Sequence, residues 1–289
     1  MEKAIKWKYI SYMEGVMSEL LKAIFFGIVE GITEWLPISS TGHLILLNEF
    51  IRLDVSESFF SMFEVVIQLG AILAVVLLFW KEIWPFSVKE RYCIREDTFV
   101  MWFKIVVACI PAAVVEILFG DEIEELFYNY VVIALALILF GIAFLVIENR
   151  NKRKRSRMNE ISDIGWNTAF WIGMFQLIAA VFPGTSRSGA TILGGILLGV
   201  SRGVAAEFTF FLAIPVMFGA SLMKLLKFGF VFTSEEVIIL AAGMVTAFLV
   251  SMVVIRFFMA YIKKHDFKVF GWYRIVLVIL VLGYFTFLR

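Results

Sequence analysis

Charged residues are scarce in this 289-residue chain: Asp, Glu, Lys and Arg make up 18% of it, whereas 61% of its residues are hydrophobic. That balance is far from the composition of an ordinary soluble domain. The formal net charge is only +1, so no global excess of positive charge indicates a nucleic-acid partner. The composition predicts an integral membrane protein.

Cysteine is also scarce, with two residues in the whole chain. Cys93 and Cys109 form neither a disulfide framework nor a metal-binding spacing, and they leave the redox compartment undecided. The first twenty residues are too interrupted by charge for the core of a signal peptide. We therefore expect no cleaved targeting segment and treat residues 1–20 as an extension.

Six apolar runs are long enough to cross the roughly 30 Å of membrane hydrocarbon, which takes about 20 helical residues. They cover residues 62–80, 99–119, 130–147, 206–226, 236–258 and 269–288. Two further apolar regions, 21–48 and 166–199, are broken by EWLPISSTGH and FPGTSRSGAT. A break exposes backbone groups that lipid cannot satisfy, so it is either a re-entrant hairpin buried in protein or a hydrophilic loop between two crossings. Short flanks and few charges favour the hairpin.

The two halves of the chain resemble each other. Aligning Pro37 with Pro183 places Glu30 over Gln176, and it sets the serines of the first break over Thr185 and Ser186. Each half then holds one hairpin and three crossings, and an odd number of crossings inverts the second half. We predict an all-α polytopic membrane protein with six transmembrane helices and two re-entrant helical hairpins in an inverted-topology repeat. Its parts are an N-terminal extension (1–20), a first repeat (21–148), a basic linker (149–161) and a second repeat (162–289).

Loop charges predict the orientation. The loops 81–98, 149–165, 200–205 and 259–268 fall on one side and together hold 14 Lys and Arg residues, whereas the opposite loops hold only Arg52 and Lys227. The basic side should be cytoplasmic, which places both termini and the mouth of the first hairpin outside. The lysines of the N-terminal extension argue against this orientation.

Acidic and basic side chains in the breaks indicate phosphate chemistry. Glu30 and Glu34 lie four apart on one helical face, so they bind a proton or a cation between them, and hard oxygen ligands suit Mg²⁺ or Ca²⁺. Alternatively they are a solvent-facing pair near a helix end. Arg187 needs an anion or an acidic partner at membrane depth, and its hydroxyl-rich, helix-starting surroundings favour a phosphate.

His43 is one of two histidines, and its place three residues after Ser40 would allow it to relay a proton for that serine as nucleophile. The serines could instead cap the returning half-helix. The candidate catalytic residues are Glu30, Glu34, Ser40, His43 and Arg187. The candidate phosphate-binding residues are Ser39, Thr41, Gly184, Thr185, Ser186, Ser188 and Thr191.

The motifs EGITEWLPISSTGH and PGTSRSGAT, in this order, resemble those of the undecaprenyl-diphosphate phosphatase, or bacitracin-resistance, family. The similarity extends through FEVVIQLGAILAVVLLFW and GVSRGVAAEFTFFLAIP and covers nearly the whole chain from about residue 20. The resemblance implies hydrolysis of undecaprenyl diphosphate to undecaprenyl phosphate and inorganic phosphate in a bacterial inner membrane. It also implies a divalent cation, a homodimer and an active site open to the outer face.

A second hypothesis is a transporter that carries polyprenyl phosphate across the membrane without hydrolysis, because broken helices in inverted repeats are typical of transporters. The carboxylate pair and His43 argue against it, since anion binding alone has no use for them. A purely structural scaffold would leave the polar breaks unexplained.

Overall fold

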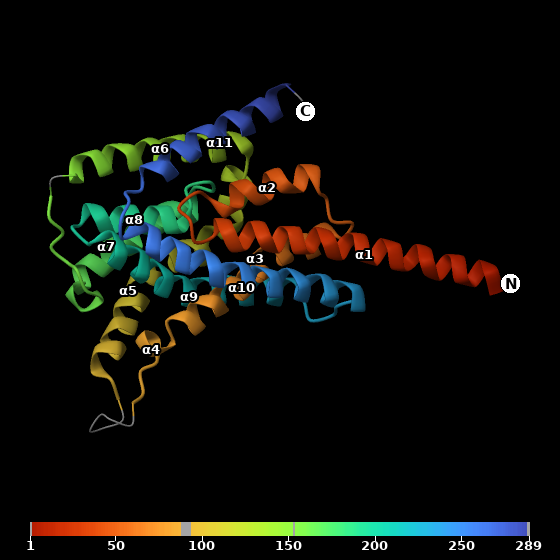
Figure 1. Ribbon diagram of the computed structural model, residues 1–289, viewed down its shortest axis with the longest axis horizontal. Coiled ribbons are helices and arrows are strands. Elements are labelled where there is room, and N and C mark those ends of the chain that lie inside the picture. The colour runs from red at the N-terminus through yellow and green to blue at the C-terminus, as the bar shows by residue number, and fades with distance from the viewer. Residues whose placement is uncertain (1, 88–93, 153, 288–289) are drawn as a thin grey trace.

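The computed structural model describes residues 2–87, 94–152 and 154–287 (Figure 1), so the predicted linker residue Arg153 and Cys93 lie outside the described residues. This part of the chain is helical, with two isolated β-bridges and no strands. Its helices are α1 (Glu2–Thr33), α2 (Ser40–Phe50), α3 (Glu57–Leu78), α4 (Trp80–Ile83), α5 (Glu96–Phe127), α6 (Tyr130–Asn151), η1 (Ile161–Asp163), α7 (Trp166–Val181), α8 (Arg187–Leu197), α9 (Arg202–Phe228), α10 (Ser234–Ile262) and α11 (Lys268–Phe287).

Five of these helices, α3, α5, α6, α9 and α10, are long and apolar enough to cross a membrane. They correspond to the first five predicted crossings. The sixth, 269–288, forms α11, which is not one of the five, and residue 288 lies outside the described part. Residues 120–129 lie between two predicted crossings and were therefore predicted to be a loop, but α5 continues through most of them to Phe127.

Both predicted helix breaks are present. The first runs from the end of α1 at Thr33 to the start of α2 at Ser40, and the second from Val181 at the end of α7 to Arg187 at the start of α8. Because α1 begins at Glu2, the predicted extension continues without interruption into the first helix of the hairpin, and this long helix projects from one end of the molecule (Figure 1).

The two breaks end in the same local structure. Ser39 and Ser186 have φ angles of 76° and 67°, and no other described residue except glycine has a positive φ. Each serine caps the next helix, because its side chain accepts a hydrogen bond from the backbone N–H three residues on. The equivalent of Ser186 is therefore Ser39 and not Ser40, which corrects the sequence alignment by one residue. Counted from the proline of each break, Ser186 comes one residue later than Ser39, and Gly184 in this stretch has φ +89°.

Helices of the first half pack against helices of the second half. Helix α1 of the first half packs along α10, and α7 of the second half packs along α5, while α6 lies beside α11 and α3 beside α9 (Figure 1). A Cβ atom on Gly27 would collide with the Gly243 carbonyl on α10, and one on Gly173 with the Ala108 carbonyl on α5. Small residues that let helices approach closely thus occupy matching positions in the two contacts.

Candidate active site

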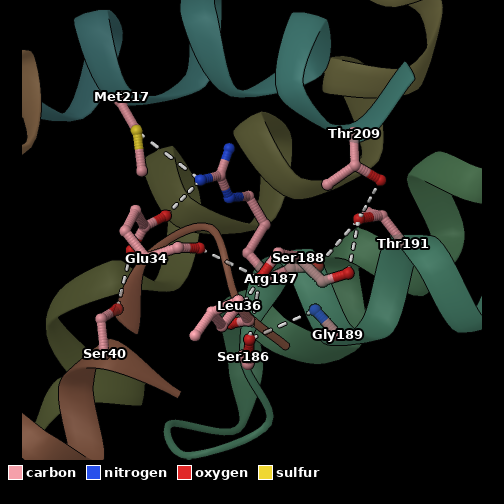
Figure 2. A network of polar contacts seen from close by, with 10 residues as sticks. All are labelled: Glu34, Leu36, Ser40, Ser186, Arg187, Ser188, Gly189, Thr191, Thr209 and Met217. Atoms are coloured by element: carbon pink, nitrogen blue, oxygen red, sulfur yellow. Dashed lines mark hydrogen bonds and ion pairs between the residues drawn. The ribbon is translucent and has the colours of Figure 1, made fainter. Parts of the chain in front are cut away.

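The two helix breaks, residues 34–39 and 182–186, form the tips of the two hairpins. These tips meet through Glu34 and Arg187. Arg187, the first residue of α8, forms an ion pair with the Glu34 carboxylate in the break after α1 (Figure 2). The neighbouring Ser188 hydroxyl donates to the Glu34 carbonyl at 3.2 Å and approaches the Leu36 carbonyl at 3.4 Å. Side-chain and backbone contacts therefore fix one tip against the other.

The acidic partner of Arg187 differs from our expectation, which favoured an external anion. The pairing with Glu34 leaves Arg187 Nη1 buried and without a hydrogen-bond partner, and Nη2 reaches only the Met217 sulfur at 3.6 Å in addition (Figure 2). A buried guanidinium N–H that lacks an acceptor is costly. Arg187 can therefore hold Glu34 and still donate to a phosphate oxygen.

Ser40 is bonded to Glu34 and not to His43. Its hydroxyl donates to Glu34 Oε2 at 2.7 Å (Figure 2). The predicted proton relay from Ser40 to His43 is wrong for this geometry, because the Ser39 carbonyl and the Tyr273 hydroxyl occupy the two ring nitrogens, each at 2.7 Å. In the neutral ring Nδ1 donates to the carbonyl and Nε2 accepts from the tyrosine. The group placed to take a proton from Ser40 is the Glu34 carboxylate.

Glu30 lies one turn before Glu34 and is completely buried. Both of its carboxylate oxygens lack a hydrogen-bond partner, as do the side-chain oxygen and nitrogen of buried Gln176 at the matching position of α7. The alternative of a solvent-facing pair is therefore excluded, because Glu34 is buried as well. Unpartnered carboxylate oxygens require a proton or a cation.

Some hydroxyl groups of the second tip and of α8 hold the local structure and do not face the Arg187 guanidinium. Thr191 lies inside the protein, where its hydroxyl contacts Thr209 at 2.9 Å and donates to the Arg187 carbonyl at 2.9 Å (Figure 2). Ser186 is occupied in part as a cap for Gly189 N–H at 3.2 Å. Thr191 thus fixes the first turn of α8 instead of facing the Arg187 guanidinium. Thr185 is completely buried, and its hydroxyl has no partner.

Arg274 on α11 ties the two tips together and was missed by the sequence analysis. This fully buried side chain donates from Nε to the Pro37 carbonyl at 2.7 Å and from Nη1 to the Thr185 carbonyl at 2.8 Å. One guanidinium thus binds the carbonyl two residues before Ser39 and the carbonyl one residue before Ser186. A signal was present, because an arginine inside an apolar helix indicates a specific buried role.

A cavity of about 240 Å³ opens beside the α2 end of the site. Ser40 and Thr41 line it together with Glu64, Gln68 and Lys224, and Tyr128 lines it as well. This cavity gives the Ser40 side of the site a polar approach.

No group of three or more His, Cys, Asp or Glu side chains that could hold a metal occurs among the described residues. The carboxylate pair is nevertheless suited to a hard cation, because Mg²⁺ commonly binds through one or two carboxylates and completes its shell with water and substrate phosphates. Of the pair, Glu30 is the residue whose two buried oxygens have no hydrogen-bond partner.

Comparison with known proteins decides the family. The model of the bacitracin resistance protein BacA family matches residues 23–280, which include both broken tips and Arg274. The chain belongs to this family. It is 65% identical over 268 residues to an undecaprenyl-diphosphatase of Desulfitobacterium hafniense, covering 93% of this chain and 96% of that protein.

Two further relatives are similarly close. A protein of Clostridium acetobutylicum named undecaprenyl-diphosphatase 1 is 64% identical over 267 residues, covering 92% of this chain and 97% of its own. An undecaprenyl-diphosphatase of Enterococcus faecalis is 61% identical over 266 residues, covering 91% of this chain and 96% of that protein. The matches run over nearly the full length of the chains, so they concern the whole architecture and not one motif.

Proposed function

We propose that this chain is an integral membrane phosphatase that hydrolyses undecaprenyl diphosphate to undecaprenyl phosphate and inorganic phosphate. The observation that carries the proposal is the contact between the two breaks, where Arg187 pairs with Glu34 and Glu34 accepts a hydrogen bond from Ser40. The names of the relatives support the same activity. A binding protein would have no need of a hydroxyl bonded to a carboxylate beside the anion-binding arginine.

The residues of the site suggest how hydrolysis proceeds. Arg187 Nη1 and the backbone N–H groups at the start of α8 bind the diphosphate and stabilise the charge that grows on the equatorial oxygens. Glu34 takes the proton of Ser40, or of a water in its place, as the oxygen attacks the terminal phosphorus and the bond to the bridging oxygen breaks, so that undecaprenyl phosphate leaves. Where Ser40 is the nucleophile, a water then attacks the phosphoserine and releases inorganic phosphate. His43, held by Ser39 and Tyr273, keeps the first turn of α2 in place. Ser186 and Ser188 border the same anion.

A divalent cation, Mg²⁺ or Ca²⁺, is part of the proposal. Glu30, with Glu34, would hold it, and its chemistry there would be to neutralise the diphosphate and activate the attacked phosphorus as a Lewis acid. The two unpartnered, buried oxygens of Glu30 support this assignment.

The proposed arrangement in the membrane has six transmembrane helices, including α11, and two re-entrant hairpins, α1–α2 and α7–α8, in an inverted repeat. The exchanged packing of α1 on α10 and α7 on α5 supports the repeat. Residues of the basic loops 149–165, 200–205 and 259–268 line one common cavity, which supports a single cytoplasmic face. A bacterial inner membrane, an active site open to its outer face and a homodimer follow from the family resemblance.

Phosphate release from undecaprenyl diphosphate by the purified protein tests the function. The wild type should release phosphate, and the Arg187→Ala and Glu34→Ala variants should lose at least a hundredfold in rate. If the wild type releases none but moves labelled polyprenyl phosphate between the leaflets of vesicles, the transporter hypothesis replaces the enzyme.

A further inference from the structure

A second polar cavity lies at the opposite end of α8 from Arg187. Its volume is about 750 Å³, within the roughly 300–1,000 Å³ of small-ligand pockets. Its walls are the basic linker after α6, the turn between α8 and α9, and the end of α10. Since α8 has 11 residues and rises about 1.5 Å per residue, roughly 15 Å separates this cavity from the active-site arginine.

Every charged residue that lines this cavity is basic. The five are Lys154, Arg155, Arg157, Arg202 and Lys263. Arg202 is the one with an acidic partner among the described residues, the completely buried Glu148. The other four form no ion pair with a carboxylate of the described residues, and Lys263 is the one of them that lies within electrostatic range of an acidic side chain, Glu207. The cavity therefore carries an excess of positive charge and attracts anions.

The walls are fixed by hydrogen bonds, unlike those of a solvated tail. Arg157 N–H donates to the Gly199 carbonyl at 2.9 Å, and Ser201 N–H donates to the Met158 carbonyl at 2.8 Å, so the linker is pinned to the α8–α9 turn. The aliphatic part of Arg157 lies over Gly199. Glu148 Oε1 accepts from Arg202 Nε at 2.9 Å and holds that side chain at the wall.

The start of α9 adds a second feature suited to an anion. Ser201, the residue before this 27-residue helix, makes no side-chain capping bond, and the first turn of α9 contains no acidic residue. The first N–H groups and the positive dipole end of the helix therefore face the basic cavity with no acidic side chain of α9 beside them.

We propose that this cavity, which we name the basic cavity, is a second anion-binding site that takes a phosphate-bearing ligand. The ligand is either the headgroup of an anionic phospholipid or a soluble phosphate compound, because both present the same oxygens to Arg155 and Arg157. This site is separate from the proposed hydrolase site and does not depend on its chemistry.

Binding to matched charge variants tests the proposal. Arg155→Ala/Arg157→Ala removes two charges from the basic cavity, and Lys152→Ala/Lys264→Ala removes two from the same region but outside its lining. All binding is measured in an Arg187→Ala background so that the diphosphate site contributes less. One arm counts phosphatidylglycerol molecules bound in neutral detergent by native mass spectrometry, and the other titrates inorganic pyrophosphate by calorimetry.

We expect Arg155→Ala/Arg157→Ala to weaken binding at least tenfold in one arm, and the control pair to change it less than twofold. Loss in the lipid arm identifies a headgroup site, and loss in the pyrophosphate arm a site for soluble phosphates. Equal weakening by both pairs would mean diffuse surface charge and would overturn the proposal, as would unchanged binding in both arms. Thermal unfolding of each variant confirms that it is folded.

Discussion

Replacing Arg274 by methionine should separate stability from activity. The change removes two hydrogen bonds, to the Pro37 and Thr185 carbonyls, and leaves two buried acceptors that cost about 1–3 kcal/mol each. It also removes a fully buried guanidinium, whose desolvation penalty is on the order of several kcal/mol. Because these contributions oppose each other, we expect the net loss of unfolding free energy to stay below about 3 kcal/mol.

The effect on catalysis should be larger, since Arg274 positions both tips without belonging to the reacting groups. A misplacement of about 1 Å at a catalytic site can lower the rate roughly a hundredfold. We therefore expect Arg274→Met to lower kcat for phosphate release about a hundredfold with little change in KM. Arg274→Lys, which can reach only one of the two carbonyls, should fall between this variant and the wild type.

Initial rates of phosphate release, measured beside thermal unfolding, provide the assay. Arg256→Met on α10 is the matched control, because the same substitution is made at an exposed position. A stable Arg274→Met protein with the kcat of the wild type would refute the positioning role. A variant that fails to unfold cooperatively would assign Arg274 to folding instead.

Three further predictions concern the site. Gly189→Ala should lower both stability and activity, because its Cβ would collide with Arg274 Nη2. Gly42→Ala is the control at the matching position and should be tolerated, because a Cβ there would have no atom nearer than 3.5 Å. The unfolding temperatures and the rates of phosphate release of both variants check this. Ser40→Ala should lower phosphate release at least a hundredfold while shifting the unfolding temperature little, and a rate within threefold of wild type would exclude Ser40 from the reaction. Removing divalent cations with a chelator should abolish phosphate release, and added Mg²⁺ should restore it. The Glu30→Gln variant should need at least a tenfold higher Mg²⁺ concentration for half-maximal activity. An unchanged Mg²⁺ requirement would remove Glu30 from the cation site.

The sequence was sufficient to predict the two helix breaks because proline, glycine and consecutive hydroxyl residues interrupt an apolar run visibly. It also pointed to Arg187 and Glu34 as members of one site, since charges at membrane depth need partners. Their direct pairing was not predictable, because the partner lies 153 residues away in sequence and is brought close by the exchanged packing of the halves.

The local errors have a common cause. The closeness of His43 and Ser40 in sequence suggested that His43 takes a proton from Ser40. In the structure, His43 is hydrogen-bonded to Tyr273 and Ser40 to Glu34. The one-residue shift in the repeat alignment arose because the capping serine lies two residues after Pro37 in the first break and three residues after Pro183 in the second. Neither a long-range hydrogen bond nor a backbone angle can be read from residue order alone.

The central claim is that the two breaks form one catalytic unit, and a double-mutant cycle on kcat/KM tests it most directly. Glu34→Gln, Arg187→Gln and the double variant are compared with the wild type in phosphate release from undecaprenyl diphosphate. Residues that act as a unit are strongly non-additive, so the double variant should be within about threefold of the slower single variant. If the two losses instead multiply, Glu34 and Arg187 act independently and the account of a shared site is contradicted.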